Sequence, residues 1–426
     1  MTDAAASRPP TTAETPEPAV GRNWAGNVHY RAARRHRPAS VDELRRLVAG
    51  AERVRAVGTG HAFNRIGDTT GDLISVAGLP PAVALDRDRS TVTVTAGLRY
   101  GDVATRLHAD GYALANLASL PHISVAGAVA TATHGSGRAN GNLATAVAAL
   151  ELVTADGDLL TVDRADPRFA GMVVNLGALG VVSRVTLDVL PTFDLRQYVR
   201  LGLPRAALDA ALDGAYSASV FTDWRSDRLD QVWLKQRADQ PPPPADWLDT
   251  VAADAPVHPV PGMPAQNCTV QLGEAGPWHE RLPHFRLGFT PSSGDELQSE
   301  WHVGRADAGA ALAALEPAAA RIAAVLQICE LRTIAADRLW LSPNYERDSV
   351  AFHFTWIGDP VAVAPVLAEV EERLAPFAPR PHWGKLFARD PAASYPRYDD
   401  FRALLREVDP AGTFRTDELD RYFPRD

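Results

Sequence analysis

The chain has 426 residues, of which 46% are hydrophobic and 22% are charged, and its formal net charge is −9. This length is sufficient for two or three domains with substantial cores. The acidic balance argues against a general nucleic-acid-binding role, because it implies no basic face. The two cysteines, Cys268 and Cys329, are too few for a disulfide framework or a cysteine-based metal site. We therefore expect no metal centre.

The first 20 residues are rich in Ala, Thr, Pro and Glu. They lack the basic start and the apolar stretch of a signal peptide. We expect residues 1–20 to form a disordered leader. Elsewhere we find no segment that approaches the run of about 18 apolar residues that a membrane helix needs. The sequence therefore predicts a cytoplasmic protein without membrane contact.

The first half of the chain alternates between predicted strands and helices. Ser40-Val-Asp-Glu43 is a capping box and predicts a helix through about Val48. Asp156-Gly157 lies between two β-rich runs and predicts a hairpin. Periodicity predicts further strands over 54–57, 73–76, 91–95 and 181–190, and a short helix over 102–109.

The second half has a different character. Residues 238–265 are rich in proline and read as a loop, and residues 307–323 form an alanine-rich helix interrupted by Pro317. Strands are expected around 325–334 and 350–357, followed by a short tail from about residue 387.

A glycine-bracketed turn, residues 58–60, follows the short apolar strand 54–57. Glycine permits positive φ and a close approach of backbone N–H groups to a ligand. His61 comes directly after this turn, so one interpretation is a phosphate cradle beside a nucleophilic imidazole. The alternative is an ordinary tight turn with a surface histidine, because short glycine motifs often arise by chance.

Residues 119–137 are small, nearly uncharged and rich in hydroxyl groups. Such a segment can lie flat against a ligand and offer it many amides and hydroxyls. It can equally be a packed interior segment of small side chains. Composition alone does not choose between the two.

Alternation predicts two strands with polar faces. Glu330 and Arg332 are two residues apart and point to the same side, and so do His353 and Thr355. The opposite face of the second strand is aromatic: Phe352, Phe354 and Trp356. Polar groups buried without partners would cost several kcal/mol. These four side chains therefore line a wet pocket, pair with one another or face bulk solvent.

Lys385 ends the segment Pro381-His-Trp-Gly-Lys385, in which Gly384 permits close approach. A partly desolvated lysine would act there as a strong local positive field. The alternative is a surface lysine whose stem covers apolar neighbours.

Eight ordered motifs relate the chain to a known family: GTGHAF at 58–63, ASLPHISVAG at 118–127, THGSG at 133–137, LGALG at 176–180, FTDWR at 221–225, HPVPGM at 258–263, CELRT at 329–333 and HWGK at 382–385. On these residues the chain resembles the FAD-dependent alditol (xylitol) oxidases of actinobacteria, within the vanillyl-alcohol-oxidase flavoprotein superfamily. The similarity runs over nearly the whole chain, from residue 23 to about residue 387.

The resemblance implies an α+β, two-domain fold of the PCMH type. The FAD-binding domain would span 21–192 and the α+β substrate-binding (cap) domain 193–380, while residues 381–426 would return to the FAD domain. No Rossmann unit is expected, in keeping with the absence of a G-x-G-x-x-G motif between a strand and a helix.

The resemblance also implies the site residues. His61 would carry FAD covalently. Further FAD contacts would come from Ala56, Val57, Gly58, Thr59, Gly60, Ala62, Ser119, Ser124, Gly127, Thr131, Ala132, Thr133, His134, Val182 and His382. The polyol would be held by Ser119, Glu330, Arg332, Thr355 and Lys385.

The expected reaction is oxidation of the terminal primary alcohol of a linear polyol such as xylitol or sorbitol, with O₂ reduced to H₂O₂. Lys385 and Arg332 would stabilise the developing alkoxide, and His353 would be the general base. The expected partners are the polyol and O₂, and we expect a monomer. Three alternatives stay open: an aldonolactone oxidase, an NAD(P)H-dependent reductase on the same flavin fold, and a flavin-binding protein without catalysis.

Overall fold

The computed structural model describes residues 21–289 and 296–425. The predicted leader, residues 1–20, lies outside these ranges, so its disorder stays a prediction.

A three-stranded parallel sheet begins the fold, in the order β1 (Arg34–His36), β3 (Asp72–Ser75) and β2 (Val54–Val57). Helix α1 (Val41–Ala49) starts where the Ser40 side chain accepts a hydrogen bond from the Glu43 N–H at 3.1 Å. This confirms the predicted cap. Leu44 and Val48 are fully buried and anchor the helix to this part of the fold.

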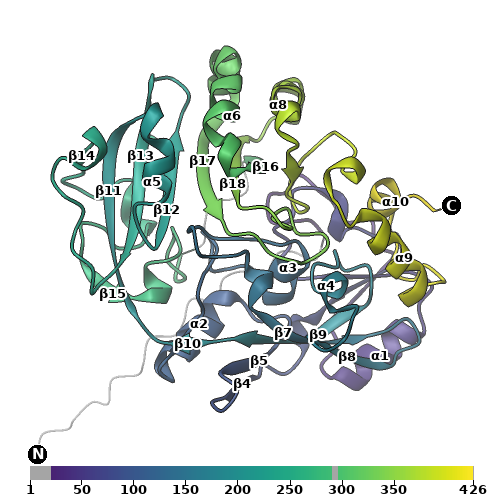
Figure 1. Cartoon of the computed structure of the whole chain (residues 1–426). Coiled ribbons are helices and arrows are strands. Elements are labelled where there is room, and N and C mark those ends of the chain that lie inside the picture. Colours follow the sequence, from purple (N-terminus) through teal and green to yellow (C-terminus); the bar gives the residue numbers. More distant parts are fainter. Residues whose placement is uncertain (1–20, 290–295, 426) are drawn as a thin grey trace, which may run out of the picture.

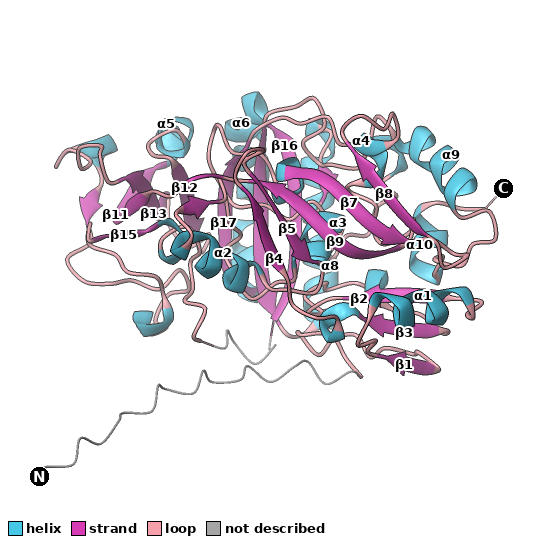
Figure 2. Ribbon diagram, turned by 90° about the horizontal axis from the view of Figure 1, so that it is seen from below, coloured by secondary structure: helices cyan, strands magenta, loops and turns pink. Residues whose placement is uncertain are grey.

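A five-stranded antiparallel sheet lies beside the first sheet (Figure 2). Its order is β4 (Val83–Asp86), β5 (Thr91–Thr95), β9 (Val181–Asp188), β7 (Val147–Val153) and β8 (Leu159–Asp163). The hairpin predicted at 156–157 joins β7 to β8. The same region contains α2 (Tyr100–Ala109), α3 (Val125–Ala130), α4 (Phe169–Met172) and the small pair β6 (Tyr112–Ala113) and β10 (Leu190–Pro191).

The strand expected over 181–190 ends earlier, at Asp188. The residues after it leave the five-stranded sheet, because Leu190 and Pro191 pair with β6 instead.

A nine-stranded sheet forms the second half of the molecule (Figure 1). Its strands are β11 (Asp194–Pro204), β12 (Ser217–Thr222), β13 (Arg228–Arg237), β14 (Val251–Ala252), β15 (Ala275–Pro277), β16 (Glu296–Gly304), β17 (Leu326–Ile334), β18 (Ser349–Ile357) and β19 (Arg380–Pro381). The centre of the sheet runs β12-β17-β18-β16, with neighbouring strands antiparallel. The predicted strands around 325–334 and 350–357 are therefore direct neighbours.

Four helices pack with the apolar side chains of this sheet: α5 (Leu208–Leu212), α6 (Ala308–Leu315), α7 (Ala319–Val325) and α8 (Pro360–Leu374). Phe352, Phe354 and Trp356 belong to that core and are fully buried. The other face of the central strands is thereby left for polar side chains.

The stretch Arg305–Val325 is long and apolar enough, by length and composition, to cross a membrane. The expectation that no segment comes near this composition was wrong. Leu312, Leu315 and Ile322 of this stretch are buried against the large sheet, and Pro317 lies in the short 3₁₀ turn that separates α6 from α7. In this structure the stretch Arg305–Val325 is part of the helical layer that packs on the large sheet.

The last part of the chain is more ordered than a tail. It contains α9 (Tyr398–Val408) and α10 (Asp417–Tyr422), which lie beside the first half of the molecule in Figure 1. The Asn64 side chain donates to the carbonyls of Trp383 and Lys385 at 2.8 and 2.9 Å. The Val54 N–H donates to the Thr413 carbonyl at 2.8 Å. The segment after β19 is thus tied to the first sheet.

Candidate active site

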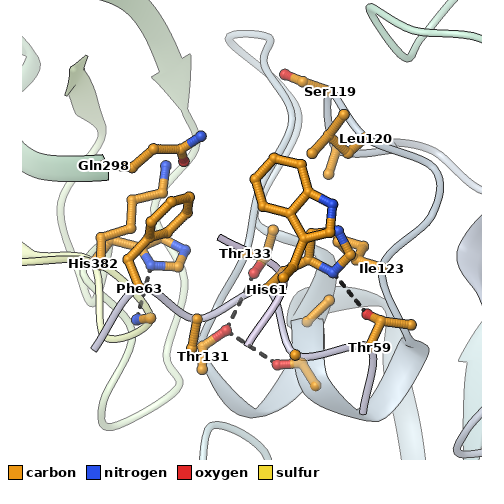
Figure 3. A pocket seen from close by; sticks show the side chains of 18 of the residues that line it. Thr59, His61, Phe63, Ser119, Leu120, Ile123, Thr131, Thr133, Gln298 and His382 are labelled. Atoms are coloured by element: carbon orange, nitrogen blue, oxygen red, sulfur yellow. Dashed lines mark hydrogen bonds between the residues drawn. The ribbon is translucent and has the colours of Figure 1, made fainter. Parts of the chain in front are cut away.

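A cavity of about 430 Å³ is lined by residues from the first sheets, the large sheet and the segment after β19. Every site residue expected from the sequence lines it except Ala132. In Figure 3, Ser119, Leu120 and Ile123 border the cavity on the side opposite Gln298 and His382, with His61 between them. Side chains separated by more than 200 positions in the sequence therefore share one space.

The glycine turn, residues 58–60, is closely packed on Ser124. A Cβ at position 58 would lie 2.0 Å from the Ser124 hydroxyl oxygen, so only glycine fits without rearrangement. Gly60 has a φ of +70°, which favours glycine. The Thr59 hydroxyl accepts a hydrogen bond from the Ser124 N–H at 3.1 Å. The turn is thus fixed against the start of α3.

His61 is held in one orientation. Its Nδ1 lies 2.9 Å from the Thr59 hydroxyl (Figure 3). Its ring stacks on Trp24 with centroids 5.2 Å apart. Its Nε2 is buried without a hydrogen-bond partner among the residues that the structure describes. Burial lowers the pKa of His61 to about 3, so the ring is neutral at physiological pH. This is an imidazole on the cavity wall and not the surface histidine of the alternative interpretation.

Arg55 supports a second loop of the cavity wall and was missed from the sequence. Its guanidinium donates to the carbonyls of Leu176 and Gly177, the latter at 2.9 Å. Leu176 has a φ of +55°, a conformation that a leucine adopts rarely. These two hydrogen bonds hold the loop in that conformation, which places it against the cavity.

Both interpretations of residues 119–137 are correct for different side chains. Val125, Ala128 and Val129 are packed in the core. Thr131 and Thr133 line the cavity and lie 3.2 Å apart through their hydroxyl oxygens (Figure 3). Ala132, an expected FAD contact, does not line the cavity, because its side chain is fully buried in the core between two residues that face the other way.

The polar faces of β17 and β18 meet as alternation predicted. Glu330 stands directly opposite His353 in the antiparallel register. Glu330 Oε2 lies 3.5 Å from Arg332 Nε and 3.6 Å from His353 Nδ1. Arg332 also donates to the Ser119 hydroxyl at 3.1 Å. Glu330 and Arg332 are each only 4% exposed, so these side chains line a pocket and do not face bulk solvent.

The protonation states of Glu330 and His353 follow from the charged side chains around them. Burial by itself would raise the pKa of Glu330, but Arg332 and His284 hold it well below its usual range. Burial, reinforced by Lys385, lowers the pKa of His353 to about 4. Glu330 is therefore an anion and His353 a neutral imidazole near pH 7.

Glu300 was missed from the sequence. It lies on β16 and stands opposite His353. Its carboxylate forms an ion pair with Lys385, which is therefore not a surface lysine, and lies 3.4 Å from Arg332. Alternation along β16 was an available signal, because Glu296, Gln298, Glu300 and His302 share one face.

His284 was also missed, and no periodic signal marks it, because it lies in a loop. Its ring stacks on Trp233 with centroids 5.1 Å apart, and its Nε2 lies 3.1 Å from Glu330 Oε1. His284 thus lies beside Oε1 of Glu330, whereas Arg332 and His353 lie beside Oε2.

His134, Glu300 and His302 bring three potential metal-ligand atoms within 4.8 Å of one another. Lys385 and Arg332 already balance the single carboxylate of this cluster. It therefore offers a cation no net negative charge, and the expected absence of a metal stays a prediction.

Comparison with known proteins identifies the family. A family model described as "FAD binding domain" matches residues 32–163, and one described as "D-arabinono-1,4-lactone oxidase" matches residues 295–422. An alditol oxidase from a Streptomyces species is 52% identical over 400 residues, covering 92% of this chain and 96% of that protein. The chain belongs to the alditol oxidase family. An L-gulono-1,4-lactone dehydrogenase from Mycobacterium tuberculosis is more distant, at 29% identity over 93% of this chain and 97% of that protein.

Solved structures agree on the fold of this alditol oxidase family member. The cholesterol oxidase from B. sterolicum superposes with a TM-score of 0.74 at 17% identity, covering 95% of this chain and 96% of that one. The xylooligosaccharide oxidase from Myceliophthora thermophila has a TM-score of 0.73 at 14% identity, covering 95% of each chain. The predicted two-part α+β flavoprotein fold and the FAD cofactor are confirmed.

Proposed function

We propose that this protein oxidises the terminal primary alcohol of linear polyols, such as xylitol and sorbitol, to the aldose, with O₂ reduced to H₂O₂. The observation that carries the proposal is that Lys385, Arg332 and His353 line the same cavity as His61. The 52% identity to a protein named alditol oxidase supports it.

The cavity residues fit FAD. Gly58 lets the glycine turn pack directly on Ser124, where a Cβ would clash, and Thr131 and Thr133 add hydroxyls to the wall. FAD, when bound, supplies the two-electron acceptor and returns the electrons to O₂. We propose that it is attached through His61, whose neutral ring has the lone pair that a covalent bond requires.

Three side chains would act on the alcohol. Lys385 and Arg332 are buried cations that stabilise negative charge on the substrate oxygen as its proton leaves. His353 is neutral and its Nε2 has no partner among the described residues, so it can accept that proton. Loss of one charge-stabilising donor typically costs about 10²–10³ in rate.

The remaining hydroxyls of the polyol would bond to Ser119, Glu330 and Thr355, which line the same cavity. A site built to hydrogen-bond each hydroxyl rejects analogues that lack them, because its own buried polar groups are then left unpaired. Polyols should therefore be preferred to simple alkanols.

The decisive experiment is anaerobic mixing of the purified protein with xylitol, sorbitol or butanol, followed through the visible flavin band. We expect rapid bleaching with both polyols and little with butanol. Lys385→Met should slow bleaching about 10²-fold or more while flavin content is unchanged. Equal rates on butanol and xylitol would overturn the proposal.

Acid precipitation tests the covalent bond. The wild-type pellet should be yellow, and His61→Ala should release its FAD and give a colourless pellet. A yellow pellet from this variant would refute attachment through His61.

An aldonolactone oxidase is the second candidate, because the D-arabinono-1,4-lactone oxidase family model matches residues 295–422. Peroxide production from xylitol, compared with gulono- and galactonolactone, separates the two. Bleaching by NADPH but not by sorbitol would instead favour a reductase, and a yellow protein inert to all of these would favour a passive flavin carrier.

The division into domains at residues 192 and 380, the monomeric state and the cytoplasmic location stay predictions. So does the absence of nucleic-acid and membrane partners. Size-exclusion chromatography with light scattering tests the monomer directly.

A further inference from the structure

Glu300 is a completely enclosed carboxylate, with 0% of its side chain exposed. Its shortest contacts with positively charged or protonatable side chains are to Lys385, Arg332 and His134. Oε2 pairs with Lys385, and Oε1 lies 3.4 Å from an Arg332 nitrogen and 2.6 Å from His134 Nε2. An anion in this position is stable only while such partners stay close.

The hydrogen bonds of His134 define its protons. Nδ1 lies 2.8 Å from the carbonyl oxygen of Gly135. A carbonyl oxygen only accepts, so Nδ1 carries a proton. Nε2 faces a carboxylate oxygen at 2.6 Å, and a contact this short between two acceptors requires a proton between them.

That second proton belongs to His134. Burial alone would raise the pKa of Glu300, but Lys385 pairs with Oε2 and Arg332 lies 3.4 Å from Oε1, and these two cations favour the ionised carboxylate. With the carboxylate ionised, Nε2 carries the proton and His134 is an imidazolium.

The two neighbouring histidines differ from His134. Burial holds the pKa of His302 and of His382 well below the usual range, so both rings are neutral. His302 has no hydrogen-bond partner among the described residues at either ring nitrogen. What distinguishes His134 from them is its direct contact with the Glu300 carboxylate.

We propose that Glu300 is a positioning residue that keeps Lys385 and His134 protonated at the wall of the flavin cavity. The part that concerns Lys385 and the polyol rests on the proposed function. The protonation of His134 does not, because it follows from the hydrogen bonds of the chain itself.

The titratable groups that face Lys385 come from every element packed around it. The charged ones are Glu300 on β16 and Arg332 and Glu330 on β17, and the neutral histidines are His353 on β18 and His382 in the adjoining loop. Burial and Arg332 favour neutral Lys385, whereas Glu300 and Glu330 favour the cation. Removing the Glu300 charge should therefore make Lys385 lose its proton at lower pH.

The first test is NMR of the holoenzyme labelled with ¹⁵N-histidine, recorded between pH 7 and 9, with His134→Asn used to assign the signal. In the wild type, both nitrogens of His134 should be protonated at pH 7.5. In Glu300→Gln, Nε2 should lose its proton at that pH. A wild-type spectrum with an unprotonated Nε2 at pH 7.5 would overturn the proposal without any activity measurement.

The second test is the pH dependence of anaerobic flavin reduction by xylitol. Because Glu300→Gln lowers the pH at which Lys385 deprotonates, the alkaline limb should move down by about one pH unit, which is about a tenfold loss of rate on that limb. Glu300→Asp keeps the charge and should restore most of the wild-type profile.

Glu371→Gln is the matched control. Glu371 is also a buried glutamate, but it accepts from neutral donors, the Ala388 N–H at 3.0 Å and the Trp301 indole at 3.3 Å, and it does not line the cavity. The pH dependence of flavin reduction in Glu371→Gln should match that of the wild type.

The outcomes separate the two proposals. If the wild type reduces no flavin with any polyol, the proposed function fails and the NMR measurement still decides the state of His134. If the wild type reacts and Glu300→Gln keeps the wild-type pH profile, the role of Glu300 fails alone. If Glu300→Gln does not fold, the wild-type spectrum and the Glu300→Asp profile decide.

Discussion

Thr355 on β18 stands directly opposite Gln298 on β16, two residues along from the pair formed by His353 and Glu300. A two-residue step along a strand is about 7 Å. That is the length of a short extended carbon chain. The pair formed by His353 and Glu300 can therefore contact one end of a linear polyol, and the pair formed by Thr355 and Gln298 can contact the other end.

Thr355→Val should therefore affect long substrates more than short ones. The change removes one hydroxyl and keeps the shape of the side chain. We expect KM for xylitol to rise about tenfold, the value of roughly one lost hydrogen bond, while the reduction rate at saturation changes little. Glycerol is too short to reach Thr355, so its KM should be almost unchanged. Equal effects on both substrates in steady-state kinetics would contradict this arrangement.

Gly58→Ala should impair FAD incorporation. The new Cβ would lie 2.0 Å from the Ser124 hydroxyl oxygen and 3.0 Å from the Ser124 Cβ, so the glycine turn must shift. The ratio of flavin to protein absorbance after purification measures the effect. Ser124→Gly in the same chain should recover part of the loss.

Gly309→Ala is the control for this substitution. Gly309 lies in α6, and a Cβ there meets nothing within 4 Å. This change should leave flavin content unchanged and add slightly to stability, since alanine is the better helix former by about 1 kcal/mol.

Thr59→Val should reduce covalent flavin, because the Thr59 hydroxyl contacts both His61 Nδ1 and the Ser124 N–H. Thr59→Ser keeps the hydroxyl and should keep the covalent bond. The fraction of FAD retained after denaturation in acid measures both variants. Full retention in Thr59→Val would show that the hydroxyl does not orient the imidazole.

His353 should make the protein sensitive to acid. Its pKa is about 4 in the folded protein and 6.5 in the reference state, so the unfolded chain binds more protons between these values. The stability that this group contributes is present above pH 6.5 and is lost as pH falls toward 4. From pH 7 to pH 5, wild-type unfolding free energy should fall by about 2 kcal/mol more than that of His353→Gln. Urea denaturation at the two pH values measures the difference, and equal losses would contradict it.

Local rules accounted for much of the fold. The serine cap predicted the start of α1, and period-two alternation predicted that β17 and β18 carry polar faces. The same rule was not applied to β16, whose polar face carries Glu300. Placing Glu300 in the site also requires knowing that β16 pairs with β18, which brings Glu300 opposite His353, 53 positions later in the sequence.

Other residues had no local signal. His284 lies in a loop, so no periodicity points to it, and tertiary contacts such as the packing of its ring on Trp233 bring it to Glu330. Helix α9 did have a signal, since Phe401, Leu404 and Leu405 form a buried stripe at helical spacing, and the expected tail is a helix there.

The docking of the segment after β19 has a consequence for biosynthesis. During translation, His61 and the glycine turn are synthesised early, whereas Lys385 and helices α9 and α10 are synthesised late. A product truncated after residue 380 would keep the imidazole of His61 and lose Lys385, the cation proposed to act on the alcohol.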